Sequence, residues 1–254
     1  IDAVEKLIKK NKKLIIISNS SKRKISTIDR LKILGFDKRD FIEVMTSGEM
    51  IWQKLNNSIE NYGNQLNNCF HIYDKSKEDG LEFRIGLEKL NFVSNINDAN
   101  FMLACTPFEN SKPIDYIPML TEALRLNLIM FCANPDFVTV EKDNEKNIFC
   151  MGTIADIYEH MGGDVIILGK PSKEIYEESC KIIKQKNLSR IVAIGDSLEH
   201  DILGANNFGI DSVLISSGIH NDLFVDSIEK GLKMFKNTKN LNCNPTYICK
   251  NFSF

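Results

Sequence analysis

The feature that most constrains the fold is the alternation of short apolar runs with amphipathic segments near both ends of the 254-residue chain. Four runs rich in β-branched residues have the length of strands that are buried on both faces: Leu14–Ile17, Val165–Leu168, Ile191–Ile194 and Val213–Ser216. Helical patterns follow them at about residues 24–34, 173–186, 199–208 and 223–235. Because strand and helix alternate with short loops, the sequence predicts an α/β fold with a doubly wound, Rossmann-like parallel sheet.

The pattern changes between about residues 46 and 164. An Asn-rich stretch at 56–68 is followed by strand candidates and by a helical pattern near residues 117–126. The strand candidates are Phe70–Tyr73, Phe101–Ala104 and Leu128–Cys132. We therefore predict a core domain formed by residues 1–45 and 165–254, with a second α/β domain, residues 46–164, inserted into it.

Composition excludes several classes of function. With 43% hydrophobic residues the chain can bury a sizeable core, and its net charge of −2 provides no basic field for nucleic acid or an anionic membrane. It has no apolar run of the roughly 18 residues that a membrane span needs, and we expect no signal peptide. The seven cysteines are odd in number and contain no C-x-x-C pair, which indicates small hydrophobic residues in a reducing, cytoplasmic setting.

Ser18 and Asn19 directly follow the first apolar run. They offer a hydroxyl, an amide and backbone N–H groups at the start of a helix, which is an arrangement that binds anions. An ordinary helix cap made of the same residue types stays open as the alternative.

Gly169, Lys170 and Pro171 follow the second strand candidate, and Pro171 suits the first position of the next helix. The ammonium group of Lys170 is a compact charge that suits a phosphoryl oxygen or damps repulsion between carboxylates; a solvated loop lysine is the alternative. The turn resembles the end of a P-loop. We reject that motif because four apolar strand residues stand where it needs glycines.

The strongest signal is the segment Gly195–Asp201. Asp196 ends an apolar strand, and Asp201 lies five residues further on, in the first turn of a helix. Both carboxylates are expected at the edge of the sheet where ligands bind, and a hard cation such as Mg²⁺ would accept them. Helix capping by an aspartate is the alternative. Glu199 and His200, between them, are expected to be solvated.

Ser18, Lys170, Asp196 and Asp201 stand in order at predicted strand ends, and this order resembles motifs two to four of the haloacid dehalogenase superfamily. The chain is most similar to the class IIA branch, the p-nitrophenylphosphatase-like proteins, which insert a cap domain between motifs two and three. The resemblance covers nearly the whole chain, and its matching segments are Ile16–Ser21, Cys132–Asp136, Leu168–Pro171 and Ile194–Ile202.

The resemblance implies a Mg²⁺-dependent phosphatase that hydrolyses a small phosphorylated metabolite through an aspartyl-phosphate, with residues 46–164 as its cap. The residues that it implies are Ser18 and Lys170 for catalysis; Ser18, Asn19 and Lys170 for phosphate; Asp196 with Asp201 for the metal; and Asn134 and Asp136 facing the substrate from the cap. For the Asn-Pro-Asp turn, a plain loop signal is the alternative. Members of this branch often pair through their caps, which implies a homodimer.

The chain departs from the family at the first motif. That motif is Asp-x-Asp on the first core strand, one Asp being the nucleophile, and no Asp-x-Asp occurs in the 254 residues. Asp2 does not replace it, because Asp2 lies in a helical pattern with no strand before it. The chain opens with Ile1 inside that pattern, so we interpret it as a piece of a longer protein whose nucleophile lies upstream of residue 1.

Two other functions stay open. A non-catalytic phosphometabolite-binding or regulatory protein would have kept the anion site and lost the nucleophile, although Lys170, Asp196 and Asp201 argue against it. A different hydrolytic chemistry on the same scaffold, such as dehalogenation, is the second alternative, and the Gly-Asp metal motif argues against it. The sequence leaves the identity of the substrate open.

Overall fold

The structure is a computed structural model that describes residues 1–61, 67–140 and 147–253. Contacts divide the chain into two compact units. The core unit contains residues 1–16, 32–43 and 170–254, and the insert unit contains residues 17–31 and 44–169. The predicted domain boundaries differ from these units at residues 17–31, 44–45 and 165–169.

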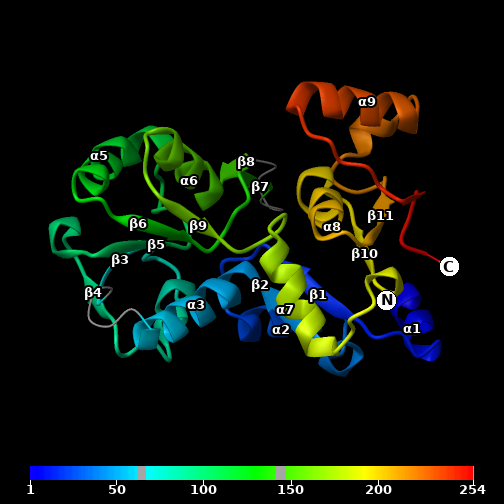
Figure 1. Cartoon of the computed structure of the whole chain (residues 1–254), viewed down its shortest axis with the longest axis horizontal. Coiled ribbons are helices and arrows are strands. Elements are labelled where there is room, and N and C mark those ends of the chain that lie inside the picture. The colour runs from blue at the N-terminus through cyan, green and yellow to red at the C-terminus, as the bar shows by residue number, and fades with distance from the viewer. Residues whose placement is uncertain (62–66, 141–146, 254) are drawn as a thin grey trace. The chain divides into compact units, whose positions relative to one another are not determined.

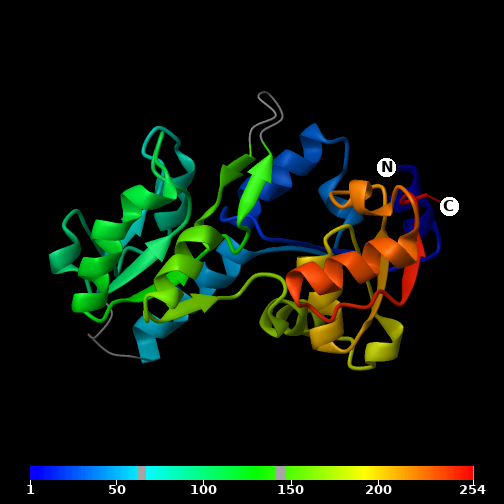
Figure 2. The ribbon, with the colours of Figure 1, turned by 90° about the horizontal axis from the view of Figure 1, so that it is seen from above.

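The insert unit is built on a parallel five-stranded sheet with the order β4-β3-β5-β6-β9. Its strands are β3 (Asn68–Ile72), β4 (Asn91–Val93), β5 (Phe101–Ala104), β6 (Ile129–Cys132) and β9 (Val165–Ile167). Its helices are α2 (Lys24–Ile33), whose last two residues belong to the core unit, α3 (Ser47–Asn61), α4 (Asp79–Arg84), α5 (Ile117–Arg125) and α6 (Met151–His160). An antiparallel pair, β7 (Val138–Val140) and β8 (Asn147–Phe149), lies outside this sheet and appears as two adjacent green arrows in Figure 2.

Helices cover both faces of the five-stranded sheet. On one face, α5 and α6 pack through residues such as Leu120 and Ile154 against Met102 and Met130 of the sheet (Figure 1). On the other face, α3 and α4 pack against the sheet and bury Ile51, Leu55 and Phe83. This double cover explains why the strands are continuous apolar runs, since a strand buried on both faces has no polar side.

The strand Val165–Ile167 lies in a different sheet from the one that we expected. We expected residues 165–168 to belong to the core sheet, but β9 pairs with β6, with Met130 opposite Val165 and Cys132 opposite Ile167. An apolar run looks the same in any buried parallel strand, so its periodicity does not reveal which edge it joins.

The core unit contains a second parallel sheet with the order β10-β11-β12. Its strands are β10 (Val192–Gly195), β11 (Asp211–Ile215) and β12 (Tyr247–Cys249), and its helices are α1 (Asp2–Lys9), α7 (Lys173–Ile183), α8 (Leu203–Phe208) and α9 (Ile228–Lys239). Leu214 of β11 and Phe235 of α9 are buried together with Leu198 and Ile202. Helix α8 ends at Gly209, whose φ of 83° is a conformation that glycine adopts without steric cost.

The strands β1 (Ile15–Ser18) and β2 (Glu43–Thr46) pair with each other, and the boundary between the two units falls inside both of them. The predicted α/β class with parallel sheets is confirmed. None of the helices within the described ranges combines the length and hydropathy required to cross a bilayer.

Candidate active site

Asp201 organises the end of strand β10 in the core unit. It lies in η6 (Leu198–Ile202), a short π-helical segment that follows the strand. Its Oδ2 accepts hydrogen bonds from the backbone N–H groups of Asp196 (3.1 Å) and Ser197 (3.0 Å). Its Oδ1 accepts from Lys170 Nζ at 2.6 Å, and both side chains are at most 15% exposed. Asp201 therefore fixes the turn that carries Asp196 and also holds the ammonium group of Lys170.

Glycines make this arrangement possible. A Cβ on Gly195 would lie 2.2 Å from the carboxylate of Asp201, and a Cβ on Gly218 would lie 2.1 Å from the Cβ of Asp196. Any side chain at either position would therefore displace a carboxylate.

Asp196 is the residue that could hold a cation. It is half-buried, and its Oδ2 accepts a hydrogen bond from the backbone N–H of Ile219 at 3.0 Å. Its Oδ1 receives no hydrogen bond from the residues that the structure describes, so this oxygen is available. Mg²⁺ usually keeps several waters and binds proteins through one or two carboxylates together with substrate phosphate. The donor set therefore fits Mg²⁺ on Asp196.

Asp201 fits a supporting role better than that of a direct ligand. Both of its oxygens already accept hydrogen bonds, and the Lys170 ammonium group on Oδ1 would repel a cation. Within residues 1–61, 67–140 and 147–253, no group of three or more His, Cys, Asp or Glu side chains is arranged to bind a metal. The assignment of Asp201 to the metal remains a prediction.

Ser18 and Asn19 lie at the end of β1, within the insert unit. The Ser18 Oγ accepts a hydrogen bond from the backbone N–H of Ser20 at 3.2 Å, which forms a local turn and not a cap on the following helix. The N-terminus of α2 is stabilised instead by Glu49, whose Oε2 accepts from the backbone N–H of Lys24 at 3.3 Å. Asn19 is 6% exposed, and its Nδ2 donates to Asp136 Oδ1 at 2.8 Å.

The Asn-Pro-Asp turn follows β6. Asn134 Oδ1 accepts from the backbone N–H of Asp136 at 3.1 Å, and the Cys132 thiol donates to the carbonyl of Asn134 at 3.2 Å. Both predicted substrate-facing side chains thus make hydrogen bonds that shape this region. The contact of Asn134 and Asp136 with a substrate stays a prediction.

Sequence reasoning missed the start of α3. Thr46 Oγ1 accepts from the backbone N–H of Glu49 at 2.9 Å, and Glu49 pairs with Arg23 at 2.8 Å. Thr46-x-x-Glu49 is the sequence signature of a helix N-terminus, so this signal was present in the chain. The neighbouring Ser47 is fully buried, and its Oγ has no hydrogen-bond partner among the described residues.

The structure brings the predicted site residues together in two groups, each held inside its own unit. Lys170, Asp196 and Asp201 form one group in the core unit. Ser18, Asn19, Asn134 and Asp136 belong to the insert unit, where a hydrogen bond joins Asn19 to Asp136.

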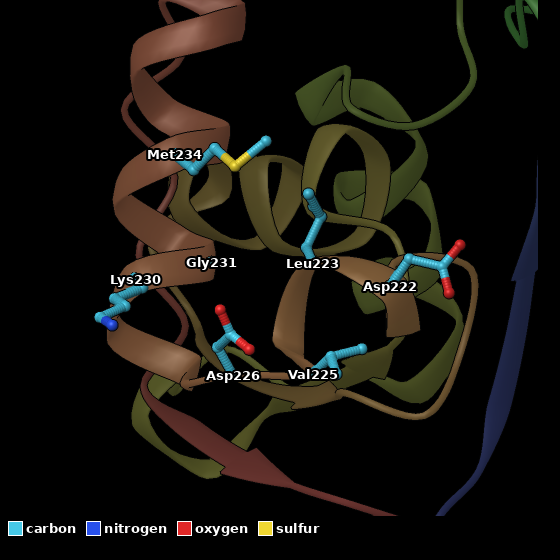
Figure 3. A pocket seen from close by; sticks show the side chains of 7 residues that line it. All are labelled: Asp222, Leu223, Val225, Asp226, Lys230, Gly231 and Met234. Atoms are coloured by element: carbon cyan, nitrogen blue, oxygen red, sulfur yellow. The ribbon is translucent and has the colours of Figure 1, made fainter.

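A pocket elsewhere in the core unit contains none of these residues. It has a volume of about 450 Å³ and lies between η7 (Asn221–Phe224) and α9. Figure 3 shows its lining side chains, among them Leu223, Val225 and Met234.

Comparisons with known proteins identify the fold family. Residues 167–253 match the family model described as HAD-hydrolase-like. A haloacid dehalogenase-like hydrolase from Brucella suis is 26% identical, with a TM-score of 0.77 over 96% of this chain and 85% of its own. Residues 167–253 are haloacid dehalogenase-like. The superfamily that the motifs predicted is therefore confirmed.

Two further structures extend the shared fold to nearly the whole chain, the insert included. A p-nitrophenyl phosphatase from Archaeoglobus fulgidus is 20% identical, with a TM-score of 0.70 over 98% of this chain and 87% of its own. A thermostable phosphatase of the same kind from Geobacillus stearothermophilus is 19% identical, with a TM-score of 0.68 over 99% of this chain and 91% of its own. A comparison with curated protein sequences finds no match.

Proposed function

We propose that this haloacid dehalogenase-like chain is the larger part of a Mg²⁺-dependent phosphatase. It would hydrolyse a small phosphorylated metabolite through an aspartyl-phosphate, with the nucleophile on a strand outside the 254 residues. The observation that carries the proposal is the available Oδ1 of Asp196, on a carboxylate held in place by Ile219 and by the turn around Asp201. The phosphatases among the similar structures support the same reaction class.

Each candidate site residue would have a separate role. Asp196 would hold Mg²⁺, which neutralises charge on the phosphoryl group. Lys170, held by Asp201, would place a fixed positive charge beside the phosphate oxygens. Ser18 and Asn19 would bind the phosphoryl group, and the insert unit would act as the cap that selects the leaving group.

Replacing Asp196 tests this proposal. In the full-length protein, Asp196→Asn should abolish Mg²⁺-dependent hydrolysis of p-nitrophenyl phosphate, because the amide lowers the charge on the cation ligand. The unfolding temperature should stay close to that of the wild type, since the amide Oδ can still accept from Ile219.

Asp222→Asn is the matched control, because Asp222 is an exposed carboxylate of the same unit and lies outside the proposed site. It should leave turnover unchanged. Unchanged activity of Asp196→Asn at saturating Mg²⁺ would refute the metal assignment.

The absence of Asp-x-Asp from these residues favours a second candidate, a phosphometabolite-binding or regulatory protein without catalysis. The full-length protein separates the two. Binding of phosphate esters without any turnover would favour the second candidate.

A further inference from the structure

The hydrogen bond between Asn19 and Asp136 joins residues that are 117 positions apart in the chain. Its acceptor is a carboxylate oxygen, and charge-assisted hydrogen bonds are about twice as strong as neutral ones. A carboxylate only accepts, so the bond also fixes which way the carboxamide of Asn19 points. Nδ2 faces Asp136, and Oδ1 faces away from it.

The carboxylate of Asp136 is itself on a rigid support. The backbone N–H of Asp136 donates to Asn134 Oδ1, and its carbonyl accepts from the backbone N–H of Gly152 at 3.1 Å. A Cβ on Gly152 would lie 2.2 Å from the carbonyl oxygen of Pro135, so the first turn of α6 packs directly on the backbone of this turn.

The opposite side of Asn19 is also closed. A Cβ on Gly169 would lie 2.8 Å from Asn19 Oδ1, from Ser47 Oγ and from Pro135 Cγ. The side chain of Asn19 therefore lies between the backbone of Gly169 and the carboxylate of Asp136. Asn19 is 6% exposed. Its side chain has little freedom to turn.

The charge of Asp136 argues against direct contact with the phosphate. A carboxylate beside a phosphate dianion would be repelled, whereas a carboxylate that holds an amide can act on the phosphate site indirectly. The same bond would explain why the turn carries an acid.

We propose that Asp136 is a positioning residue, which acts by orienting the carboxamide of Asn19 in the phosphate-binding group. This inference rests on the proposed function, because Asn19 belongs to phosphate binding through that proposal. In this proposal Asp136 contacts Asn19 inside the protein and does not contact the leaving group of the substrate.

A double-mutant cycle on the full-length protein tests the inference, with the affinity for inorganic phosphate as the readout. Asp136→Ala and Asn19→Ala should each weaken phosphate binding about tenfold, as expected for the loss of one hydrogen bond to a charged group. The double variant should be no weaker than either single variant, because both changes remove the same bond. Asp136→Asn keeps an acceptor oxygen and should restore most of the affinity.

Asp98→Ala is the control and should leave the affinity for inorganic phosphate unchanged, since Asp98 is an exposed carboxylate of the insert unit. Additive losses in the double variant would overturn the proposal, because Asp136 and Asn19 would then act independently. If Asp136→Ala kept its phosphate affinity and lost activity only on large substrates, the proposal would also be wrong. That result would indicate that Asp136 contacts the leaving group directly. A wild-type protein that binds phosphate but hydrolyses no ester would contradict the proposed function without affecting this cycle.

Discussion

His71 shows how a single buried residue can make stability depend on pH. It is 6% exposed on β3, where Arg84 Nε donates to its Nδ1 at 3.2 Å and its Nε2 lies 3.3 Å from Cys105 Sγ. Arginine only donates, so Nδ1 carries no proton and the ring is neutral. Burial, together with the charge of Arg84, lowers the pKa of His71 from 6.5 to about 3.

This lowered pKa predicts a loss of stability in acid. Between pH 6.5 and 3 the unfolded chain takes up a proton on His71 that the folded chain does not, so stability falls as the pH falls. From pH 7.5 to pH 5 the loss from this residue is about 2 kcal/mol. In urea unfolding at the two pH values, His71→Gln should lack this loss, since Gln still accepts from Arg84 but does not titrate.

His160→Gln is the matched control. His160 is exposed at the end of α6, and its hydrogen bond with the Asp156 carbonyl raises its pKa, so its replacement should keep the acid-induced loss. An equal pH dependence in His71→Gln and the wild type would show that His71 is not held neutral.

The buried cysteines behave as the sequence predicted. All seven are free, and burial raises the pKa of Cys69, Cys105, Cys132 and Cys150. A thiol with a raised pKa is rarely ionised and is a poor nucleophile. These residues therefore pack as small hydrophobic side chains.

At the scale of the elements, the start of α3 is packed very closely. Helix propensity therefore predicts the wrong sign for the change in stability when Gly48 is replaced with alanine. Gly48 lies in the first turn, and replacing glycine with alanine in a helix ordinarily stabilises it by up to about 1 kcal/mol. Here the new Cβ would lie 2.0 Å from the carbonyl oxygen of Ser21 and 2.7 Å from that of Lys22. Both contacts are with backbone atoms, which cannot move away by a change of rotamer as a side chain could.

We therefore expect Gly48→Ala to destabilise the protein by about 3 kcal/mol, in the range of overpacked cores. Gly162→Ala is the comparison, because its Cβ would meet nothing within 4 Å although φ is 97°. That variant should lose only about 1 kcal/mol, from backbone strain alone. Thermal unfolding measures both, and a stabilised Gly48→Ala would contradict the packing of α3 on the turn at residues 20–22.

At the scale of the whole molecule, β10 has an open edge. Among the described residues it pairs with β11 on one side only, and two of its apolar residues, Val192 and Ile194, are 48% and 40% exposed. Parallel strands are normally buried and flanked on both sides, and an open edge with exposed apolar residues invites a further strand. We expect that strand to be the one that carries the proposed Asp-x-Asp nucleophile.

The encoding gene and one stability measurement check this expectation. The gene should encode an apolar strand ending in Asp-x-Asp upstream of Ile1. Protein expressed from the full gene should unfold at a higher temperature than a polypeptide of residues 1–254. Equal unfolding temperatures would contradict the added strand, and an upstream strand without the first Asp would favour the non-catalytic candidate.

The sequence alone determined the class of fold and the position of several polar residues at the ends of strands. Alternating periodicity and turn chemistry depend on neighbours a few residues apart, so the strands at Ile15–Ser18, Phe101–Ala104 and Val192–Gly195 were predicted to within about two residues. For the same reason, the local pattern was enough to assign polar residues such as Asp196 to strand ends.

Only the tertiary structure decided which distant groups meet. It placed β9 beside β6, turned Asp136 toward Asn19, and gave both oxygens of Asp201 to hydrogen bonds. These outcomes depend on packing between segments far apart in the chain, and the local pattern around each residue carries no information about its distant partner. The close packing at Gly48 shows the same limit, since helix propensity describes one segment and the carbonyl of Ser21 belongs to another.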